Sequence, residues 1–115
     1  MRLVLIESPF AGDIARNVLY ARACMIDCLQ RGEAPFASHL LYTQILDDSR
    51  ADHRALGIRA GLEWGKAAES TVVYEDRGVS PGMKIGIRVA IEAGRRVEYR
   101  RLGGEWEVED AAMPG

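Results

Sequence analysis

Two short loops rich in Ser, Pro and Gly have the composition of ligand-binding turns. The first, Ser8–Gly12, follows an apolar run and precedes a segment of helical periodicity that Asp13 can cap. Backbone N–H groups at a helix N-terminus favour a phosphate group, because the positive end of the helix dipole lies behind them. Gly12 would let the backbone approach such a ligand closely. The alternative is an ordinary strand-to-helix turn, and no Gly-Lys-Ser/Thr follows as in a Walker-type loop.

The second loop, Ser80-Pro81-Gly82, has the same features. Ser80 can serve as the N-cap of the next helix, and Pro81 stands where the first helical turn tolerates proline. Two such loops at one edge of a sheet could hold the two ends of a nucleotide. The alternative is that both are simple helix caps.

His39 and Tyr42 are further candidates for ligand contacts. A neutral imidazole at position 39 could hydrogen-bond a base or a phosphate, although a single His beside an apolar segment is also typical of a structural role. Tyr42 could stack on a base or lie at a subunit contact. His53 lies in the charged stretch 47–54, which predicts a solvated surface position.

The two cysteines do not indicate a metal site. Cys24 and Cys28 are one helical turn apart, with no second Cys or His pair at metal-binding spacing. Small apolar neighbours indicate thiols that pack in the core. Two cysteines are also too few for a disulfide scaffold, so we expect a reducing, cytoplasmic setting, and we predict no metal and no cofactor.

Strand and helix patterns alternate along the chain. The predicted strands and helices, in order, are Arg2–Glu7, Ile14–Arg31, Ala34–Ser38, Ala51–Ala68, Thr71–Glu75, Met83–Ala93 and Arg96–Arg101, with Glu105–Val108 as a possible returning strand. This order predicts an α/β fold with an open, mainly parallel sheet of four to five strands and helices on both faces, Rossmann-like in arrangement. We expect one domain over residues 1–108 and a flexible tail over 109–115.

The carboxyl ends of parallel strands meet at one edge of such a sheet, and ligands bind there. Three segments should gather at this edge: Glu7–Asp13, Ser38–Gln44 and Glu75–Met83. They contain most of the polar residues that surface solubility does not explain.

Three further patterns concern packing. Glycines recur every four residues at Gly57, Gly61 and Gly65, which indicates either close approach to a neighbouring backbone or a loosely formed helix. Trp64 and Tyr74 are expected in the core. The arginines at 95, 96, 100 and 101 alternate with acidic residues, which predicts a solvated strand edge.

The overall composition is that of a folded, nearly neutral domain. The chain has 115 residues, 48% of them hydrophobic, and 15 Lys+Arg against 17 Asp+Glu give a net charge of -2. The apolar content argues against disorder, and the charge argues against binding of nucleic acid by phosphate neutralisation. Its apolar runs are far shorter than the roughly 20 residues of a membrane helix, so we expect neither nucleic acid nor a membrane as a partner.

The motifs above, taken together, resemble the nucleoside 2-deoxyribosyltransferase-like superfamily, and more closely its small uncharacterised phage and bacterial members. The segments that carry the resemblance span about residues 2–99: the Ser-Pro-aromatic-Ala-Gly turn, Arg16-Asn17 with Tyr20-Ala21-Arg22, Ala34–Leu40, and Ser80–Met83. It implies cleavage or transfer of the N-glycosidic bond of nucleosides or nucleotides, and assembly as a dimer or larger homo-oligomer. The ligand-binding residues predicted from the loops and from the resemblance are Ser8, Pro9, Phe10, Ala11, Gly12, Asn17, His39, Tyr42, Ser80, Pro81, Gly82 and Met83.

The resemblance fails at the carboxylates. The family's nucleophilic Glu, six residues after the loop Ser, falls on Gly86, and a second acidic position falls on Gly61. An oxocarbenium-like transition state needs a carboxylate nearby. Two hypotheses follow: a protein that binds a nucleotide or a nucleotide-derived signal without cleaving it, as a phage protein could, or an N-glycosidase or deoxyribosyltransferase that uses another carboxylate. Glu7, at a strand end, is the first candidate, and a scaffold with the fold alone is a third possibility.

Overall fold

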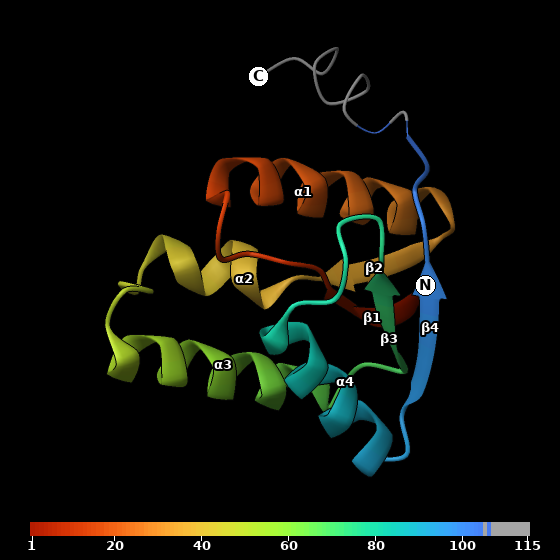
Figure 1. Ribbon diagram of the computed structural model, residues 1–115. Coiled ribbons are helices and arrows are strands. Elements are labelled where there is room, and N and C mark those ends of the chain that lie inside the picture. Colours follow the sequence, from red (N-terminus) through yellow and green to blue (C-terminus); the bar gives the residue numbers. More distant parts are fainter. Residues whose placement is uncertain (105, 107–115) are drawn as a thin grey trace.

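A computed structural model describes residues 1–104 and 106 of the chain (Figure 1). Its elements are β1 (Arg2–Glu7), α1 (Ile14–Gln30), β2 (Glu33–Phe36), α2 (Ser38–Leu41), the 3₁₀ turn η1 (Tyr42–Gln44), α3 (Ala51–Gly65), β3 (Ser70–Tyr74), α4 (Pro81–Glu92) and β4 (Arg96–Arg100). The predicted returning strand at 105–108 and the predicted tail at 109–115 lie outside the described residues, except that Trp106 is described and packs against Tyr20.

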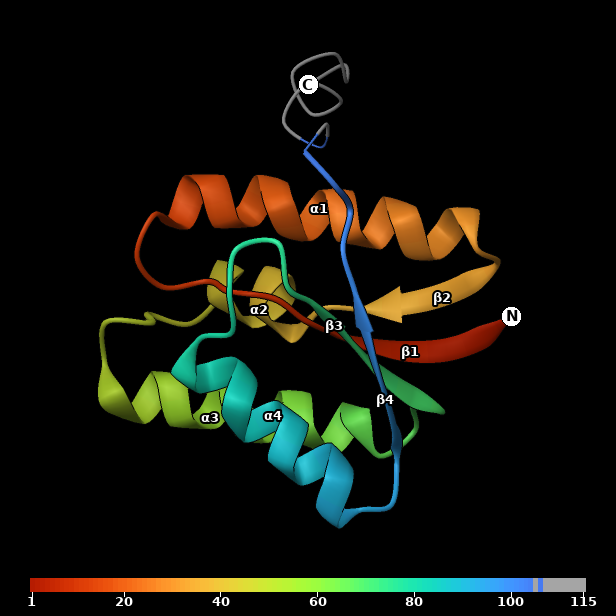
Figure 2. The ribbon, with the colours of Figure 1, turned by 45° about the vertical axis from the view of Figure 1, so that its right-hand side comes forward.

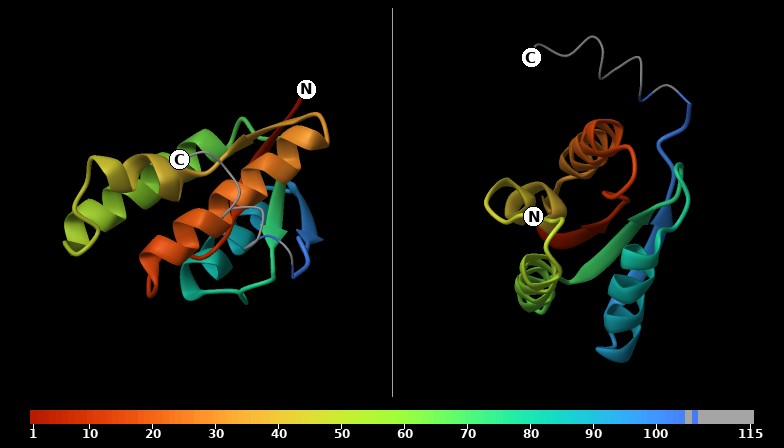
Figure 3. Two further views of the ribbon diagram at one scale, coloured as in Figure 1. Left: turned by 90° about the horizontal axis from the view of Figure 1, so that it is seen from above. Right: turned by 60° about the vertical axis from the view of Figure 1, so that its left-hand side comes forward.

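The four strands form one parallel sheet in the order β2-β1-β3-β4. Helix α1 covers one face, and α3 and α4 cover the other (Figures 1 and 3). The predicted α/β architecture is therefore confirmed. The chain order reverses between β1 and β3, and such a reversal opens a crevice beyond the carboxyl ends of these strands. Figure 2 shows that the loops after β1 and β3 emerge at the same end of the sheet as α2.

Buried strands and capped helices explain why the sequence adopts these elements. The centre of β1 is buried, and every residue of β3 is buried, as the continuous apolar runs predict. The Asp13 side chain accepts a hydrogen bond from Arg16 N (3.2 Å) at the start of α1, and Ser80 Oγ accepts one from Met83 N (3.3 Å) at the start of α4. Gly32, with φ 78°, follows the end of α1.

The glycine spacing of α3 allows close packing. An ideal Cβ on Gly61 would lie 2.7 Å from the Ser38 side chain, and one on Gly65 would lie 3.1 Å from Leu5 Cδ2. A side chain at either position would force a neighbour to move. Of the two interpretations of this spacing, the structure supports close approach.

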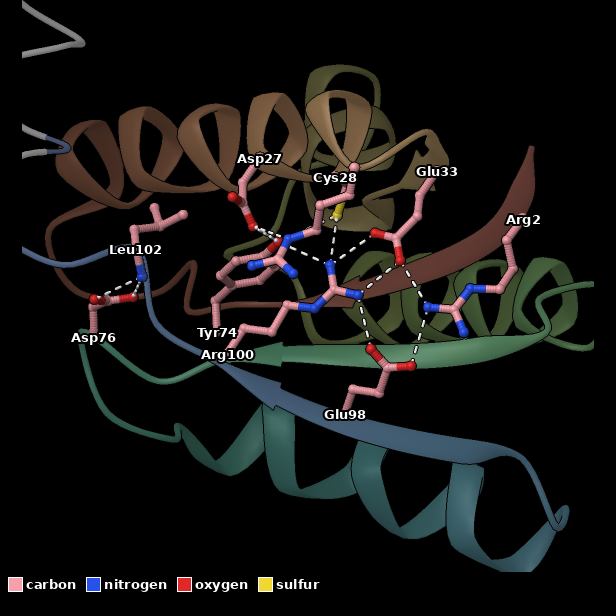
Figure 4. A network of polar contacts seen from close by, with 10 residues as sticks. Arg2, Asp27, Cys28, Glu33, Tyr74, Asp76, Glu98, Arg100 and Leu102 are labelled. Atoms are coloured by element: carbon pink, nitrogen blue, oxygen red, sulfur yellow. Dashed lines mark hydrogen bonds and ion pairs between the residues drawn. The ribbon is translucent and has the colours of Figure 1, made fainter.

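Two packing predictions are wrong. Trp64 is 58% exposed and stacks on Phe36 at the surface, because close packing on one side of α3 leaves its side chain on the outer side. Arg100 does not belong to a solvated strand edge. Its guanidinium is enclosed by Glu33, Glu98 and Tyr74 on the α1 side of the sheet (Figure 4).

Other predictions about individual residues are confirmed. Tyr74 is fully buried, and its hydroxyl donates to Asp27 (2.6 Å). Cys24 and Cys28 are buried free thiols.

No helix within residues 1–104 and 106 is long and apolar enough to span a bilayer.

Candidate functional site

A cleft of about 460 Å³ opens at the carboxyl edge of the sheet. The end of β1, the loop after it and the start of α4 form one part of its lining, and α2, η1, the loop before α3 and the first half of α3 form the rest. Most of the residues singled out from the sequence line this cleft: Glu7, Ser8, Phe10, Ala11, His39, Tyr42, Ser80, Pro81 and Gly82. The three segments predicted to gather here contribute to one lining.

Four of the predicted ligand residues do not line the cleft: Pro9, Gly12, Asn17 and Met83. Two of them support the loops from behind. Asn17 is buried, and its Nδ2 donates to the backbone oxygens of Phe10 and Ala11 (3.0 Å each). The Met83 sulfur accepts from Ser80 N (3.3 Å). Both residues therefore hold the shape of the site.

Glu7 brings a carboxylate to the floor of the cleft. It is the last residue of β1, and its carboxyl group lies directly against Gly86 of α4, in the space that a side chain at position 86 would enter. No ion pair or hydrogen bond to the described residues holds this carboxyl. Burial raises its pKa to about 8, and the charge of Arg95 opposes that rise. Burial therefore favours the protonated form of Glu7 at neutral pH.

A neutral pair, Ser8 and His39, lies beside this carboxyl. Ser8 Oγ and His39 Nε2 are 2.7 Å apart, and the Phe10 ring meets the imidazole edge-on. Burial lowers the pKa of His39 to about 4, so the ring is uncharged at physiological pH. An uncharged ring can donate from one nitrogen and accept at the other. Ser8 can then present either a donor or an acceptor to a ligand.

The outer wall of the cleft contains residues that the sequence analysis missed. Asp48 lies in the loop before α3, and His53 and Arg54 lie in the first turns of α3. His53 is partly exposed at the surface, as its charged neighbours predict, and its Nδ1 accepts from Asp47 N (2.9 Å). Arg54, Gly57 and Ile58 share one face of α3 at helical spacing, and this spacing is the signal that could have revealed the wall.

The site can hydrogen-bond and enclose a small organic ligand, and it offers one carboxyl group at its floor. Its aromatic walls are Phe10 and Tyr42, and its hydroxyl groups include Ser8, Ser38, Thr43 and Ser80. Within the part of the chain that the structure describes, no cluster of three His, Cys, Asp or Glu residues could hold a metal ion.

Comparison with a solved structure confirms the nucleoside 2-deoxyribosyltransferase-like α/β fold that the resemblance predicted. A solved 2-deoxyribosyltransferase from the psychrotolerant bacterium Bacillus psychrosaccharolyticus is similar to this chain, with a TM-score of 0.64 and 19% identity over 90% of this chain and 74% of that one. Residues 2–100 match the family described as "Domain of unknown function (DUF7768)", and the chain belongs to this family. No curated protein matches it.

Proposed function

We propose that this protein cleaves the N-glycosidic bond of a nucleoside or nucleotide, with Glu7 as the carboxylate that acts at the anomeric carbon. One observation carries the proposal: the Glu7 carboxyl fills the space in front of Gly86 and lines the cleft. The resemblance predicts the nucleophilic carboxylate at position 86. Here a carboxyl group from a strand end occupies the position that the Cβ of a helix residue at 86 would take.

The absence of a side chain at Gly86 is what makes this arrangement possible. A Cβ at that position would overlap the Glu7 carboxyl group, so the two positions cannot both hold a carboxylate side chain in this geometry. An oxocarbenium-like centre is stabilised by a carboxylate within about 3–3.5 Å. We expect Glu7 to meet that geometric need, because its carboxyl lies against Gly86 and lines the cleft.

The rest of the cleft suits a nucleoside. Its volume of about 460 Å³ lies within the usual range for small-ligand sites. Phe10 and Tyr42 offer surfaces for a flat base. Ser8, His39 and Ser80 offer neutral hydrogen-bonding groups for sugar hydroxyls, and the N-terminal turn of α4 faces the same space.

A second candidate function is binding without turnover, as in a protein that sequesters a nucleotide signal. The observation that favours it is the pKa of Glu7, which burial raises to about 8. A protonated carboxyl is a poor nucleophile, so the raised pKa of Glu7 disfavours the reactive form at neutral pH. Binding alone would then be the observable property unless the ligand promotes ionisation of Glu7.

The test is a panel of nucleosides, deoxynucleosides and their 5′-monophosphates incubated with the protein at pH 8.5, with free base measured by chromatography. We expect base release that falls at least about 100-fold in Glu7→Gln. The control is Glu69→Gln, since Glu69 is exposed and lies before β3, away from the cleft lining. Calorimetric binding without base release would support the second candidate. No binding and no release would contradict both.

A further inference from the structure

The titratable side chains of the cleft are few and unevenly placed. Glu7 lies on the floor, His39 is uncharged beside it, and the outer wall contributes Asp48, His53 and Arg54. Among the described residues that line the cleft, Glu7 and Asp48 are the only carboxyl groups. If Glu7 acts at the anomeric carbon, it is not free to protonate the departing base at the same time.

Cleavage of an N-glycosidic bond leaves its electron pair on the base nitrogen. A neutral base needs a proton from a general acid as it departs, and such an acid contributes about 10²–10⁴ to the rate. A base that already carries a positive charge departs as a neutral molecule and needs no proton. The general acids that a cleft contains therefore indicate which bases can depart from a substrate bound there.

We propose that this cleft acts on N-glycosides whose leaving base is already cationic, such as an N-alkylated purine or a pyridinium ring. This inference rests on the proposed function. Its geometric support is one carboxyl on the floor next to the Ser8–His39 pair, which is held at 2.7 Å and contains no imidazolium that could protonate a departing base. The aromatic walls agree with it, since Phe10 and Tyr42 can attract a cation through their ring faces.

A cationic ligand would also favour the ionised form of Glu7. An opposite charge nearby favours the ionised form of a carboxyl and lowers its pKa. Arg95 already acts in that direction from within the fold, and a positive base in the cleft would add to it. Binding would therefore generate the carboxylate that the reaction uses and release a proton.

The reaction balances without a further reagent. The bond between C1′ and the base nitrogen breaks, and its electron pair neutralises the positive charge of the base. The Glu7 carboxylate stabilises the positive C1′ or forms an ester with it. Water then adds to C1′, the carboxylate is freed, and the proton of the water passes to solvent. The products are the sugar, a neutral base and one proton.

The test compares 7-methylguanosine with guanosine, which differ by one methyl group and a positive charge. Each rate of base release is divided by the uncatalysed rate of the same compound, because the cationic nucleoside is intrinsically more reactive. We expect the rate enhancement for 7-methylguanosine to exceed that for guanosine about 100-fold or more, which is the contribution of the missing general acid.

Enhancements within tenfold of each other would overturn the inference and leave the proposed function standing. Release of neither base would contradict the proposed function as well. Asp48→Asn is the decisive variant, because Asp48 is the other carboxyl of the lining. We expect the ratio of the rate enhancements for 7-methylguanosine and guanosine to be the same in this variant as in the parent protein. Suppose that the parent protein cleaves guanosine, and that Asp48→Asn abolishes cleavage of guanosine but not of 7-methylguanosine. Asp48 is then a general acid, and the inference is wrong.

Discussion

Two glutamates at opposite ends of neighbouring strands have opposite environments. Glu33 begins β2, and its carboxylate lies 2.7 Å from both Arg100 and Arg2 (Figure 4). Glu7 ends β1 and lies against Gly86 with no ion pair among the described residues. The pKa of Glu33 falls to about 2, chiefly through its hydrogen bonds to Arg100, whereas burial raises the pKa of Glu7 to about 8.

The difference separates a structural charge from one that is available for chemistry. The hydrogen bonds of Glu33 are satisfied by two guanidinium groups, so its ionisation is fixed and its contribution is to stability. Glu7 is half-buried beside a cleft with no ion pair or hydrogen bond to its carboxyl among the described residues, and perturbed groups of this kind concentrate at functional sites. One sheet thus contains a fixed ionic network at one end and a titratable acid at the other.

The largest expected effect on stability comes from removing Arg100, which pairs with Glu33. Arg100→Met leaves Glu33 buried beside Arg2 alone, and removal of one partner of a buried ion pair costs about 3–5 kcal/mol. We expect urea unfolding to show a loss of that size. Lys66→Met is the matched control, because the Lys66–Glu63 pair is exposed, and its loss should change stability by less than about 1 kcal/mol. Equal effects of the two substitutions would remove the contrast.

A smaller effect on stability, which depends on pH, comes from Glu7. The folded pKa of Glu7 lies above its unfolded value of 4.5, so the folded state binds more protons and stability falls as pH rises from 4.5 to 8. His39 acts in the opposite sense below pH 6.5, because its folded pKa is about 4. Between pH 6.5 and 8 the contribution of Glu7 is therefore the larger of the two.

In that interval we expect the parent protein to lose about 2 kcal/mol of stability, since each pKa unit is worth about 1.4 kcal/mol. Glu7→Gln should remove most of this slope, because an amide does not titrate. Urea unfolding at half-unit pH steps measures both proteins. A parent protein whose stability is flat across the interval would show that Glu7 is already ionised in the fold.

The sequence was sufficient to predict the sheet, the caps and the loops of the cleft, because each depends on local chemistry. Apolar runs specified β1 and β3, and Asp13 and Ser80 capped the helices that they precede. The segments of the edge cleft followed from the topology of parallel strands.

Contacts between distant segments could not be predicted in the same way. The burial of Arg100 depends on Glu33, 67 positions away, and nothing in the local pattern of β4 reveals that partner. Glu7 was singled out as a carboxylate at a strand end, but its position against Gly86 depends on how α4 packs on the sheet. The wall formed by Asp48, His53 and Arg54 likewise requires the placement of α3.

The most direct test of the proposal is to move the carboxylate from position 7 to position 86. The measurement is base release by Gly86→Glu, by Glu7→Gly, and by the variant that carries both substitutions, with folding checked by circular dichroism. Each single variant should keep less than about 1% of the parent activity, the first because its new side chain displaces the Glu7 carboxyl from its place and the second because it has no carboxylate there. The double variant should recover at least about a tenth of the parent activity, since one carboxylate then fills the shared space. A folded double variant without activity, or an active Glu7→Gly, would contradict this account.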